Sequence, residues 1–259
     1  MRVVSWNVNS LRARLHRVEE LLAQHQPDVV LLQETKCAPE QFPHEELAAM
    51  GYHAADASSG RWTGVAILAR RELAIEDPTT ELFGNPLASE ARWVEATVSG
   101  IRFASVYVVN GRSLDHEMYF VKLEFLQAIA DRAGDLREKG PMIIAGDMNV
   151  CPTDLDVWNP VAFEGHTHVS APERKALTRV LESGGLVDAH RHRYGDDAVQ
   201  YTWWDYRAGS FHKNQGLRID LHLVSESLAG QIADVRILRD LRKGDKPSDH
   251  APLELELTD

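Results

Sequence analysis

The chain has 259 residues, of which 44% are hydrophobic and 26% are charged, and its formal net charge is −11 at pH 7. This composition predicts a folded chain with a large core, and no apolar stretch reaches the ~18–20 residues that a membrane-spanning helix needs. The N-terminus lacks the apolar core and cleavage site of a signal peptide, and the two cysteines are too few for a disulfide framework, so we expect a cytoplasmic protein with no membrane partner.

The negative net charge argues against a nucleic-acid partner, because such domains usually carry a basic face. That argument weakens when the acids are clustered, since carboxylates gathered around Mg²⁺ leave room for a separate basic rim. Three basic stretches, 11–17, 173–179 and 190–194, are candidates for such a rim, and each is equally compatible with a solvated face.

The first half of the chain alternates short apolar runs with one longer amphipathic segment. Continuous apolar runs are typical of buried strands, and apolar residues spaced three or four apart predict helices. A turn at Ser99-Gly100 predicts that the two strands beside it form a hairpin. In chain order, we expect a strand at 3–6, a helix at 11–26, a strand at 28–34, a helix at 44–50, and strands at 63–69, 92–98 and 101–109.

The second half continues the same alternation. Ser170 and Glu173 have the spacing of a capping box, which predicts a helix start, and Gly184-Gly185 predicts its end. In the last run, 253–257, alternation predicts that the leucines face inward and that Glu254 and Glu256 face outward. In chain order, we expect a helix at 115–132, a strand at 141–147, a helix from 170 to 184, and strands at 217–225 and 253–257.

No linker or change of composition divides the chain, so we expect one domain spanning 1–259, with strands in two sheets and helices outside.

Polar residues stand at the ends of the core strands. Charged groups there are costly to desolvate unless they pair or bind metal. One such acid is usually a cap or turn residue, and Asp249-His250 alone would suit a solvated turn. The whole set suits phosphoester hydrolysis, because Mg²⁺ prefers oxygen ligands and polarises phosphoryl oxygens. The set comprises Asn7, Glu34, Asp147, Asn149, Asp220, Asp249 and His250.

Eight motifs in a fixed order give the chain a close resemblance to the exonuclease III family of AP endonucleases, within the endonuclease/exonuclease/phosphatase superfamily. The motifs extend from residue 5 to residue 253, so the resemblance covers nearly the whole chain. They are SWNVNSLRARL (5–15), LLQETK (31–36), GVAIL (64–68), VYVVNGR (106–112), GDMNVCPTDLDVW (146–158), YTWWDYR (201–207), GLRIDL (216–221) and SDHAPL (248–253).

The resemblance implies an α/β fold, a four-layer αββα sandwich of two packed mixed β-sheets. It implies a Mg²⁺ or Mn²⁺ ion with Glu34 as the chief ligand and Asn7 and Asp249 beside it. The resemblance also places Asp147, Asn149 and His250 among the residues around the metal.

The resemblance also implies roles in catalysis. Asp220 orients His250, which contacts the scissile phosphate, and Tyr107 donates to a phosphate oxygen. Asp147 handles the proton of the attacking water or of the leaving group, and Asn149 positions the phosphate or the nucleophile.

The resemblance further implies that the protein recognises damaged DNA through an apolar pocket, which accepts a deoxyribose that has lost its base. Trp203, Leu217 and Trp204 match its walls, although Trp204 is equally compatible with core packing. Asn110 and Arg112 match residues near the DNA backbone, whose contacts position DNA without reading its sequence. Val109 departs from the family pattern, which has proline there, and this bears on the placement of Tyr107.

The resemblance therefore implies a metal-dependent DNA repair nuclease. It would cut 5′ to abasic sites in double-stranded DNA and trim 3′ ends in the 3′→5′ direction, acting as a monomer in the cytoplasm, at the nucleoid. The alternatives are a phosphatase for inositol phosphates or sphingolipid headgroups and a non-catalytic homologue. A zinc site at His166 and His168 is disfavoured, because no cysteine or third histidine lies near them in the sequence.

Overall fold

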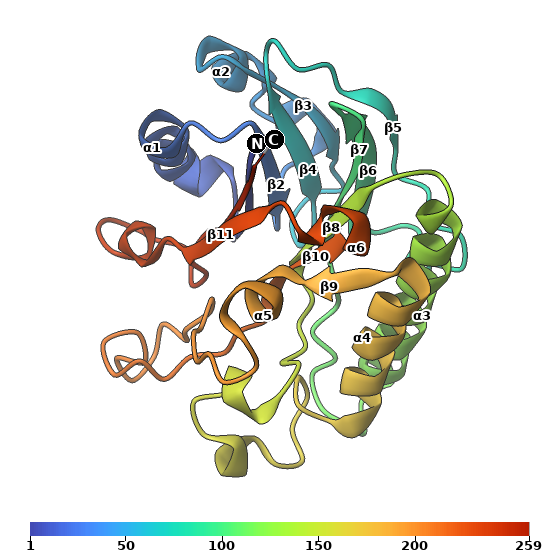
Figure 1. Ribbon diagram of the computed structural model, residues 1–259. Helices are drawn as coiled ribbons and strands as arrows, with labels where there is room; N and C mark the ends of the chain where they lie inside the picture. Colours follow the sequence, from blue (N-terminus) through green and yellow to red (C-terminus); the bar gives the residue numbers. More distant parts are fainter. Residues whose placement is uncertain (259) are drawn as a thin grey trace.

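Two six-stranded β-sheets pack face to face, and helices cover their outer faces, in the computed structural model, which describes residues 1–258 (Figure 1). The order of layers is helix, sheet, sheet, helix. The expected four-layer αββα sandwich is confirmed.

The first sheet is mixed. β1 and β2 run parallel, and their other neighbours run antiparallel. Helices α1 (Leu15–His25) and α2 (His44–Ala49) lie with this sheet, and a 3₁₀ turn at Arg12–Arg14 precedes α1. The strand order is β11 (Ile232–Ile237), β12 (Leu253–Leu257), β1 (Arg2–Asn7), β2 (Val29–Gln33), β4 (Val65–Arg70) and β3 (Tyr52–Ala57).

The second sheet is also mixed, with β7 and β8 parallel. Its outer face is covered by α3 (Glu117–Arg137) and α4 (Ala171–Gly184), while the short helices α5 (Ala189–Tyr194) and α6 (Glu226–Ala229) contact β9 and β10. The strand order is β5 (Glu76–Thr79), β6 (Trp93–Val98), β7 (Ile101–Tyr107), β8 (Met142–Asp147), β10 (Asp220–Ser225) and β9 (Leu186–Asp188).

The hydrophobic core has three layers, one between the sheets and one under each helical layer. Burying apolar side chains in this way is the dominant favourable term in folding. Polar contacts also join the sheets, since Gln33 donates to Ser105 Oγ over 3.0 Å and Ser105 donates to Leu32 O over 2.9 Å. These contacts lie close to the edge where the strands carrying site residues end.

Strand direction brings the polar residues together. The parallel strands β1 and β2 both end at one edge of their sheet, and β7 and β8 end at the adjacent edge of the other, where Tyr107 pairs with Asp147. The antiparallel strand β10 begins there, because Asp220 pairs with Asp147. The segment before β12 arrives at the same end, since β12 pairs antiparallel with β1.

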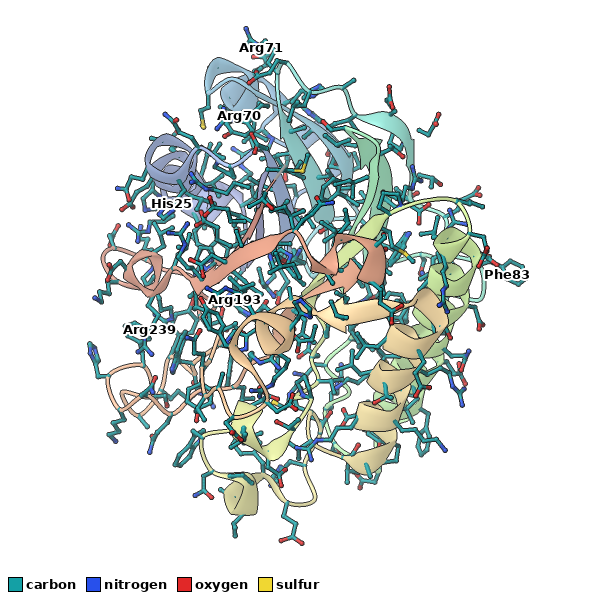
Figure 2. The ribbon with its side chains drawn as sticks, viewed as in Figure 1. His25, Arg70, Arg71, Phe83, Arg193 and Arg239 are labelled. Atoms are coloured by element: carbon teal, nitrogen blue, oxygen red, sulfur yellow. The ribbon has the colours of Figure 1, made fainter. Side chains whose placement is uncertain are left out.

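The long connection between β8 and α4 lies at this end of the molecule, at the bottom of Figure 1. Arg70 and Arg71 lie at the opposite end of the sheets, at the top of Figure 2, and Phe83 projects into solvent beside α3.

Two local predictions are confirmed in detail. Ser99 and Gly100 both have left-handed backbone conformations between β6 and β7, as a tight hairpin turn requires. Ser170 and Glu173 form the capping box at the start of α4, which ends at Gly184 with Gly185 as its C-cap. Within residues 1–258, every helix is too short or too polar to span a bilayer.

Glu254 was predicted to face outward, and this direction is confirmed. Its side chain does point away from the inter-sheet core, but only 1% of it is exposed, because Arg2, His25 and Arg236 pair with it. Alternation predicted the face correctly, but it carried no information about what covers that face.

Asp220 was expected inside a strand over 217–225, but β10 begins at Asp220 itself. The preceding residues diverge because Leu217 forms isolated bridges with Val157 and Trp203. Several short or exposed elements were not predicted: β3, β5, β9, β11, α5 and α6.

Candidate active site

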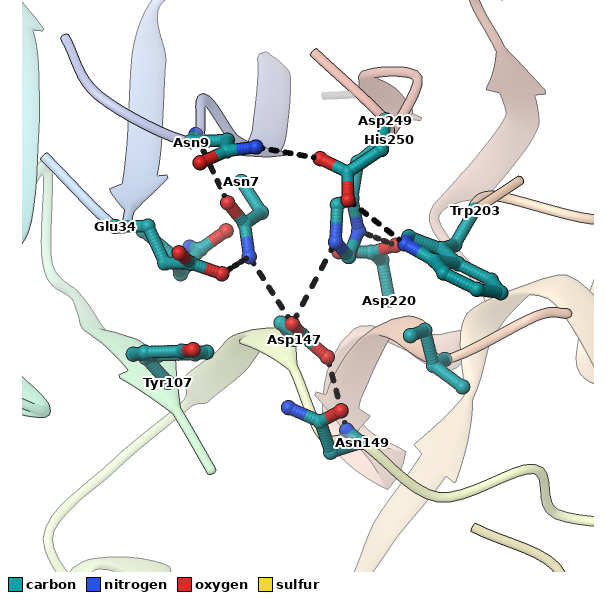
Figure 3. A network of polar contacts seen from close by, with 12 residues as sticks. Asn7, Asn9, Glu34, Tyr107, Asp147, Asn149, Trp203, Asp220, Asp249 and His250 are labelled. Carbon is teal, nitrogen blue, oxygen red and sulfur yellow. Dashed lines mark hydrogen bonds and ion pairs between the residues drawn. The ribbon is translucent and has the colours of Figure 1, made fainter. Parts of the chain in front are cut away.

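A cavity of about 230 Å³ lies at the strand ends where the two sheets meet. Figure 3 shows the polar network that surrounds it, with side chains contributed by both sheets. The cavity is lined by Glu34, Tyr107, Asn110, Asp147, Asn149, His168, Trp203, Leu217, Ile219, Asp249 and His250.

Three ligand-type side chains converge on one point. Glu34, Asp147 and His250 each offer an atom that lies within 4.8 Å of the others. Asn7 links two of them, since its Nδ2 donates to Glu34 over 2.7 Å and to Asp147 over 3.0 Å. The two carboxylates suit a hard cation such as Mg²⁺ or Mn²⁺, which takes oxygen ligands and retains waters. The donor set therefore fits the expected metal.

Glu34 follows β2 in a strained backbone conformation, with φ of 51°. Non-glycine residues seldom adopt this conformation, and such strain concentrates at functional sites. Lys36 Nζ lies 2.7 Å from Glu34 Oε2, so the carboxylate carries a cationic partner in addition to Asn7. The turn after β2 thus aims Glu34 into the cavity rather than along the sheet.

Asp147 is buried at the end of β8, and both of its oxygens accept hydrogen bonds. The Asn149 N–H donates to Oδ1 over 2.9 Å, and Asn7 donates to Oδ2. Burial and the neighbouring carboxylates of Asp220 and Glu34 raise the pKa of Asp147, against the opposing charge of His250. Asp147 is therefore a stronger base than a solvated aspartate.

Gly146 makes this position possible. Its φ is 151°, and a Cβ there would lie 1.9 Å from Val106 O on the paired strand β7. Any other residue would push β8 away from β7 and displace Asp147 with it.

Asp220 and His250 form a buried pair. Asp220 Oδ2 lies 2.8 Å from His250 Nδ1, and His250 Nε2 lies 3.8 Å from Asp147 Oδ2. Burial works to lower the pKa of His250, but Asp220, Asp147 and Asp249 outweigh it and raise the pKa. Asp220 thereby holds the proton on Nδ1 and turns Nε2 toward the cavity.

Asp249 lies at the cavity wall, outside the group of three converging ligands. Its Oδ1 accepts from Asn9 Nδ2 over 3.1 Å, and its Oδ2 accepts from Trp203 Nε1 over 3.0 Å (Figure 3). Burial works to raise the pKa of Asp249, but His250 and the Trp203 N–H outweigh it and lower the pKa.

Tyr107 is held by Arg92 despite the valine at 109. The Arg92 guanidinium lies 4.6 Å from the Tyr107 ring centroid, and its Nη1 donates to Tyr107 O over 3.3 Å. Burial and the charges of Glu34 and Asp147 raise the pKa of Tyr107, so its hydroxyl keeps its proton and can donate it in a hydrogen bond.

The apolar side of the cavity is formed by Trp203, Leu217 and Ile219, with Val157 packed behind them. Trp204 does not line this cavity. It is fully buried, edge-on to Phe211 and beneath the Arg239 guanidinium. Of the two roles left open for Trp204, the structure therefore supports core packing over the pocket wall, because successive residues of this extended segment face opposite sides.

Asn110 and Arg112 follow β7 in an exposed loop. Asn110 reaches the cavity, and its Nδ2 lies 3.5 Å from Asn149 Oδ1, whereas Arg112 does not line the cavity and contacts His116. Asn149 itself is fixed by donating from Nδ2 to Val108 O over 2.7 Å.

Sequence reasoning missed four residues that shape the site. Asn9 and Lys36 lie in the quoted motifs, so their spacing to Asn7 and Glu34 was an available signal. His168 had been considered only as a zinc ligand. Instead, it lines the cavity, with Nδ1 donating to Asn149 O over 2.6 Å. Lys122 sits on a helix with no polar pattern to distinguish it.

The chain was compared with known proteins. Residues 4–250 match the model of the Endonuclease/Exonuclease/phosphatase family. The chain is 35% identical to the exodeoxyribonuclease III of Haemophilus influenzae, over 99% of each chain.

Solved structures agree. The 3′ phosphatase NExo from Neisseria, bound to a product DNA hairpin, is 36% identical with a TM-score of 0.95, over 100% of this chain and 99% of that one. An AP endonuclease from Archaeoglobus fulgidus is 32% identical with a TM-score of 0.93, over 100% of both chains. The match over nearly the whole length, together with the carboxylate–histidine site at the strand ends, shows that this chain belongs to the endonuclease/exonuclease/phosphatase family.

Proposed function

We propose that the chain is a Mg²⁺- or Mn²⁺-dependent DNA repair nuclease that cuts 5′ to abasic sites and trims 3′ ends in the 3′→5′ direction. The observation that carries this proposal is the convergence of Glu34, Asp147 and His250 beside an apolar wall of Trp203 and Leu217. The first group suits phosphodiester hydrolysis, and the second suits a sugar without its base.

Glu34 would hold the cation, with Asn7 and Asp249 beside it. When bound, the cation supplies a Lewis acid that neutralises charge on the phosphate oxygens. His250 Nε2 and the Tyr107 hydroxyl donate to those oxygens, where negative charge accumulates in the transition state. Asn149, held by Val108 O, fixes the position of the phosphate.

Asp147 would take the proton of the attacking water. Both of its oxygens accept hydrogen bonds in the structure, as an ionised carboxylate does, and its raised pKa strengthens it as a base. A positioned base of this kind contributes about 10²–10⁴-fold to the rate. The proton could then pass through solvent, since the cavity is open to the surface.

Substrate choice would rest on size. The wall of Trp203, Leu217 and Ile219 offers an apolar face to a deoxyribose, and a base-bearing nucleotide is bulkier and costs more to extrude. Asn110 and Arg112, both exposed in the loop after β7, would contact the DNA backbone. As one domain spanning 1–259, the chain would act as a monomer on chromosomal DNA in the cytoplasm.

A second candidate is removal of a phosphate from a DNA 3′ end. It is favoured by the likeness to the Neisseria 3′ phosphatase, whose structure superposes with a TM-score of 0.95. The same residues would serve, because both reactions displace an oxygen from a phosphorus atom. The difference lies in how the DNA end enters the cavity.

Three labelled duplexes distinguish these activities: one with an internal abasic site, one with a recessed 3′ hydroxyl, and one with a 3′ phosphate. We expect metal-dependent cleavage of at least one of them, stopped by EDTA. Glu34→Gln should lower the rate by about 10²-fold or more at low Mg²⁺, with partial recovery in Mn²⁺, because an anionic ligand is lost. Release of phosphate from inositol polyphosphates, with all three duplexes intact, would contradict the proposal.

A further inference from the structure

Trp203 has two distinct contacts in the site. Its side chain lines the cavity together with Leu217, and its indole N–H donates to Asp249 Oδ2 over 3.0 Å. The same residue therefore borders the space for the sugar and holds a carboxylate beside the metal-binding group. Figure 3 shows the indole edge directed at Asp249.

The backbone ties the two residues together as well. Trp203 forms a bridge with His250, and Trp204 N–H donates to Asp249 O over 3.0 Å. On its other side, Trp203 exchanges hydrogen bonds of 3.0 Å with Leu217. These backbone contacts hold the segments that carry Trp203 and Asp249 side by side, so that the indole N–H lies within reach of the carboxylate.

The contacts continue from Asp249 toward the metal-binding carboxylates. Asn9 donates to Asp249 Oδ1 over 3.1 Å and accepts from Lys36 Nζ over 2.7 Å. Lys36 also lies 2.7 Å from Glu34 Oε2. Both carboxylate oxygens of Asp249 therefore accept hydrogen bonds. Trp203, in the wall of the sugar pocket, donates to one, and Asn9, on the side of Glu34, donates to the other.

We propose that Trp203 is a positioning residue for Asp249, so that the sugar pocket and the metal-binding carboxylates are coupled through the indole N–H. The inference rests on the proposed function, and it assigns Trp203 a role beyond that of a pocket wall. A hydrogen bond to a charged carboxylate is among the stronger ones in proteins, and the rigid indole aims it in one direction.

Coupling of this kind has a consequence for selectivity. A sugar that packs against Trp203 would restrain the indole and with it Asp249, which then completes the metal surroundings. A nucleotide that cannot enter would leave Asp249 less well ordered. Substrate entry and assembly of the metal site would then favour each other, as linked binding events must.

Trp203→Phe is the decisive variant, because it removes the N–H and keeps an aromatic, although smaller, side chain in the wall. Trp204→Phe is its matched control. The Trp204 indole nitrogen is buried without a hydrogen-bond partner among residues 1–258, so Trp204→Phe makes the same change of ring size without breaking a side-chain hydrogen bond, and this residue lies outside the cavity. Melting temperatures establish that each variant is folded at the assay temperature.

We expect Trp203→Phe to lower kcat on the preferred duplex by about 10-fold, with KM changed less than about two-fold, since the lost hydrogen bond positions Asp249 and an aromatic wall remains for the sugar. Trp204→Phe should change neither by more than about two-fold. In an Asp249→Ala background, Trp203→Phe should have almost no further effect, because residues that act as a unit are non-additive.

The second measurement needs no DNA. The chain has six tryptophans, and the indole ¹H–¹⁵N resonance of Trp203 is identified by its absence from the Trp203→Phe spectrum. We expect this resonance to move when Mg²⁺ is added and to stop responding in Asp249→Ala. That result would stand even if the chain proved inactive on all three duplexes.

Two outcomes would overturn the inference. One is an indole resonance that ignores Mg²⁺, and the other is a kcat loss in Trp203→Phe that persists unchanged in the Asp249→Ala background. If the wild-type protein is an active nuclease and either of these results is found, the proposed function stands, and Trp203 serves only as a wall of the pocket.

Discussion

The buried pair of Asp220 and His250 shows how single side chains set the chemistry. A buried imidazolium is costly without an anionic partner, and Asp220 lies 2.8 Å from its Nδ1. The partner raises the pKa of His250 and fixes which nitrogen faces the cavity. In the proposed function, the contribution of the ring would therefore depend on Asp220, a residue that does not line the cavity.

His250→Asn should lower kcat by about 10²–10⁴-fold, because a donor to the transition-state phosphate is lost. Asp220→Asn should cost somewhat less, since the ring survives but loses the anionic partner that keeps it protonated and oriented. The double variant should resemble His250→Asn alone, measured by single-turnover cleavage of the preferred duplex. A double variant whose loss equals the product of the two single losses would show that the residues work independently.

Elements are joined at the site by a fully buried lysine. Lys122 on α3 pairs with Glu173 on α4, and both side chains are 0% exposed. Its Nζ donates to Asn149 O over 2.7 Å and to Asn110 O over 3.3 Å. One cation thus connects two helices to the two loops that carry the site amides.

Glu173 extends this connection. It accepts from the Thr167 hydroxyl over 2.7 Å and from the His168 N–H over 3.0 Å. Burial, opposed by Glu173, lowers the pKa of Lys122. A buried pair of this kind is weak evidence for stability, because desolvation offsets the attraction. The contacts of the Lys122–Glu173 pair indicate that it positions the loops that carry Asn110, Asn149 and His168.

Lys122→Met should therefore affect both stability and catalysis. Removing one partner leaves Glu173 as an uncompensated buried charge, at a cost of about 3–5 kcal/mol. We expect kcat to fall by about 10-fold or more at a temperature where the variant is folded, because displacement of the site by about 1 Å is costly. Urea unfolding and single-turnover rates would measure the two effects.

Arg132→Met supplies the comparison. Arg132 also lies on α3 and pairs with a fully buried carboxylate, Glu95, but that pair lies away from the cavity. We expect a loss of stability with kcat unchanged within about two-fold. Equal losses of kcat in both variants would mean that Lys122 acts only through stability.

The packing of the whole molecule includes a polar contact between the two sheets. His222 on β10 is buried, and its Nε2 donates to Leu253 O on β12 over 2.9 Å. Burial lowers the pKa of His222 to about 4, from 6.5, so the folded protein keeps this ring neutral in mild acid. The unfolded chain, by contrast, takes up a proton below about pH 6.5.

Stability contributed by His222 is therefore lost as pH falls from about 6.5 toward 4. His222→Gln keeps a donor for Leu253 O and does not titrate. Between pH 7 and pH 5, we expect the wild-type protein to lose about 2 kcal/mol of unfolding free energy relative to this variant. Urea unfolding of both proteins at the two pH values tests this, and parallel curves would show that His222 shares the solvated pKa.

Much of the architecture was predictable from the sequence. Apolar periodicity is a local property, so it indicated the long helices and the buried strands, and the capping box marked the start of α4. Ordered motifs identified Glu34, Asp147, Asp220 and His250 before their contacts were known. Short or exposed elements such as β5 and β9 carry too few residues for such a pattern.

Which side of an irregular segment faces the site was decided by the tertiary structure alone. Trp203 and Trp204 are identical in type and adjacent in sequence, yet one lines the cavity and the other lies in the core. The same holds for Glu254, buried under three basic side chains, and for Lys122, whose partners are distant in sequence. Sequence patterns record local periodicity, whereas burial and charge pairing depend on segments that meet only when the sheets pack.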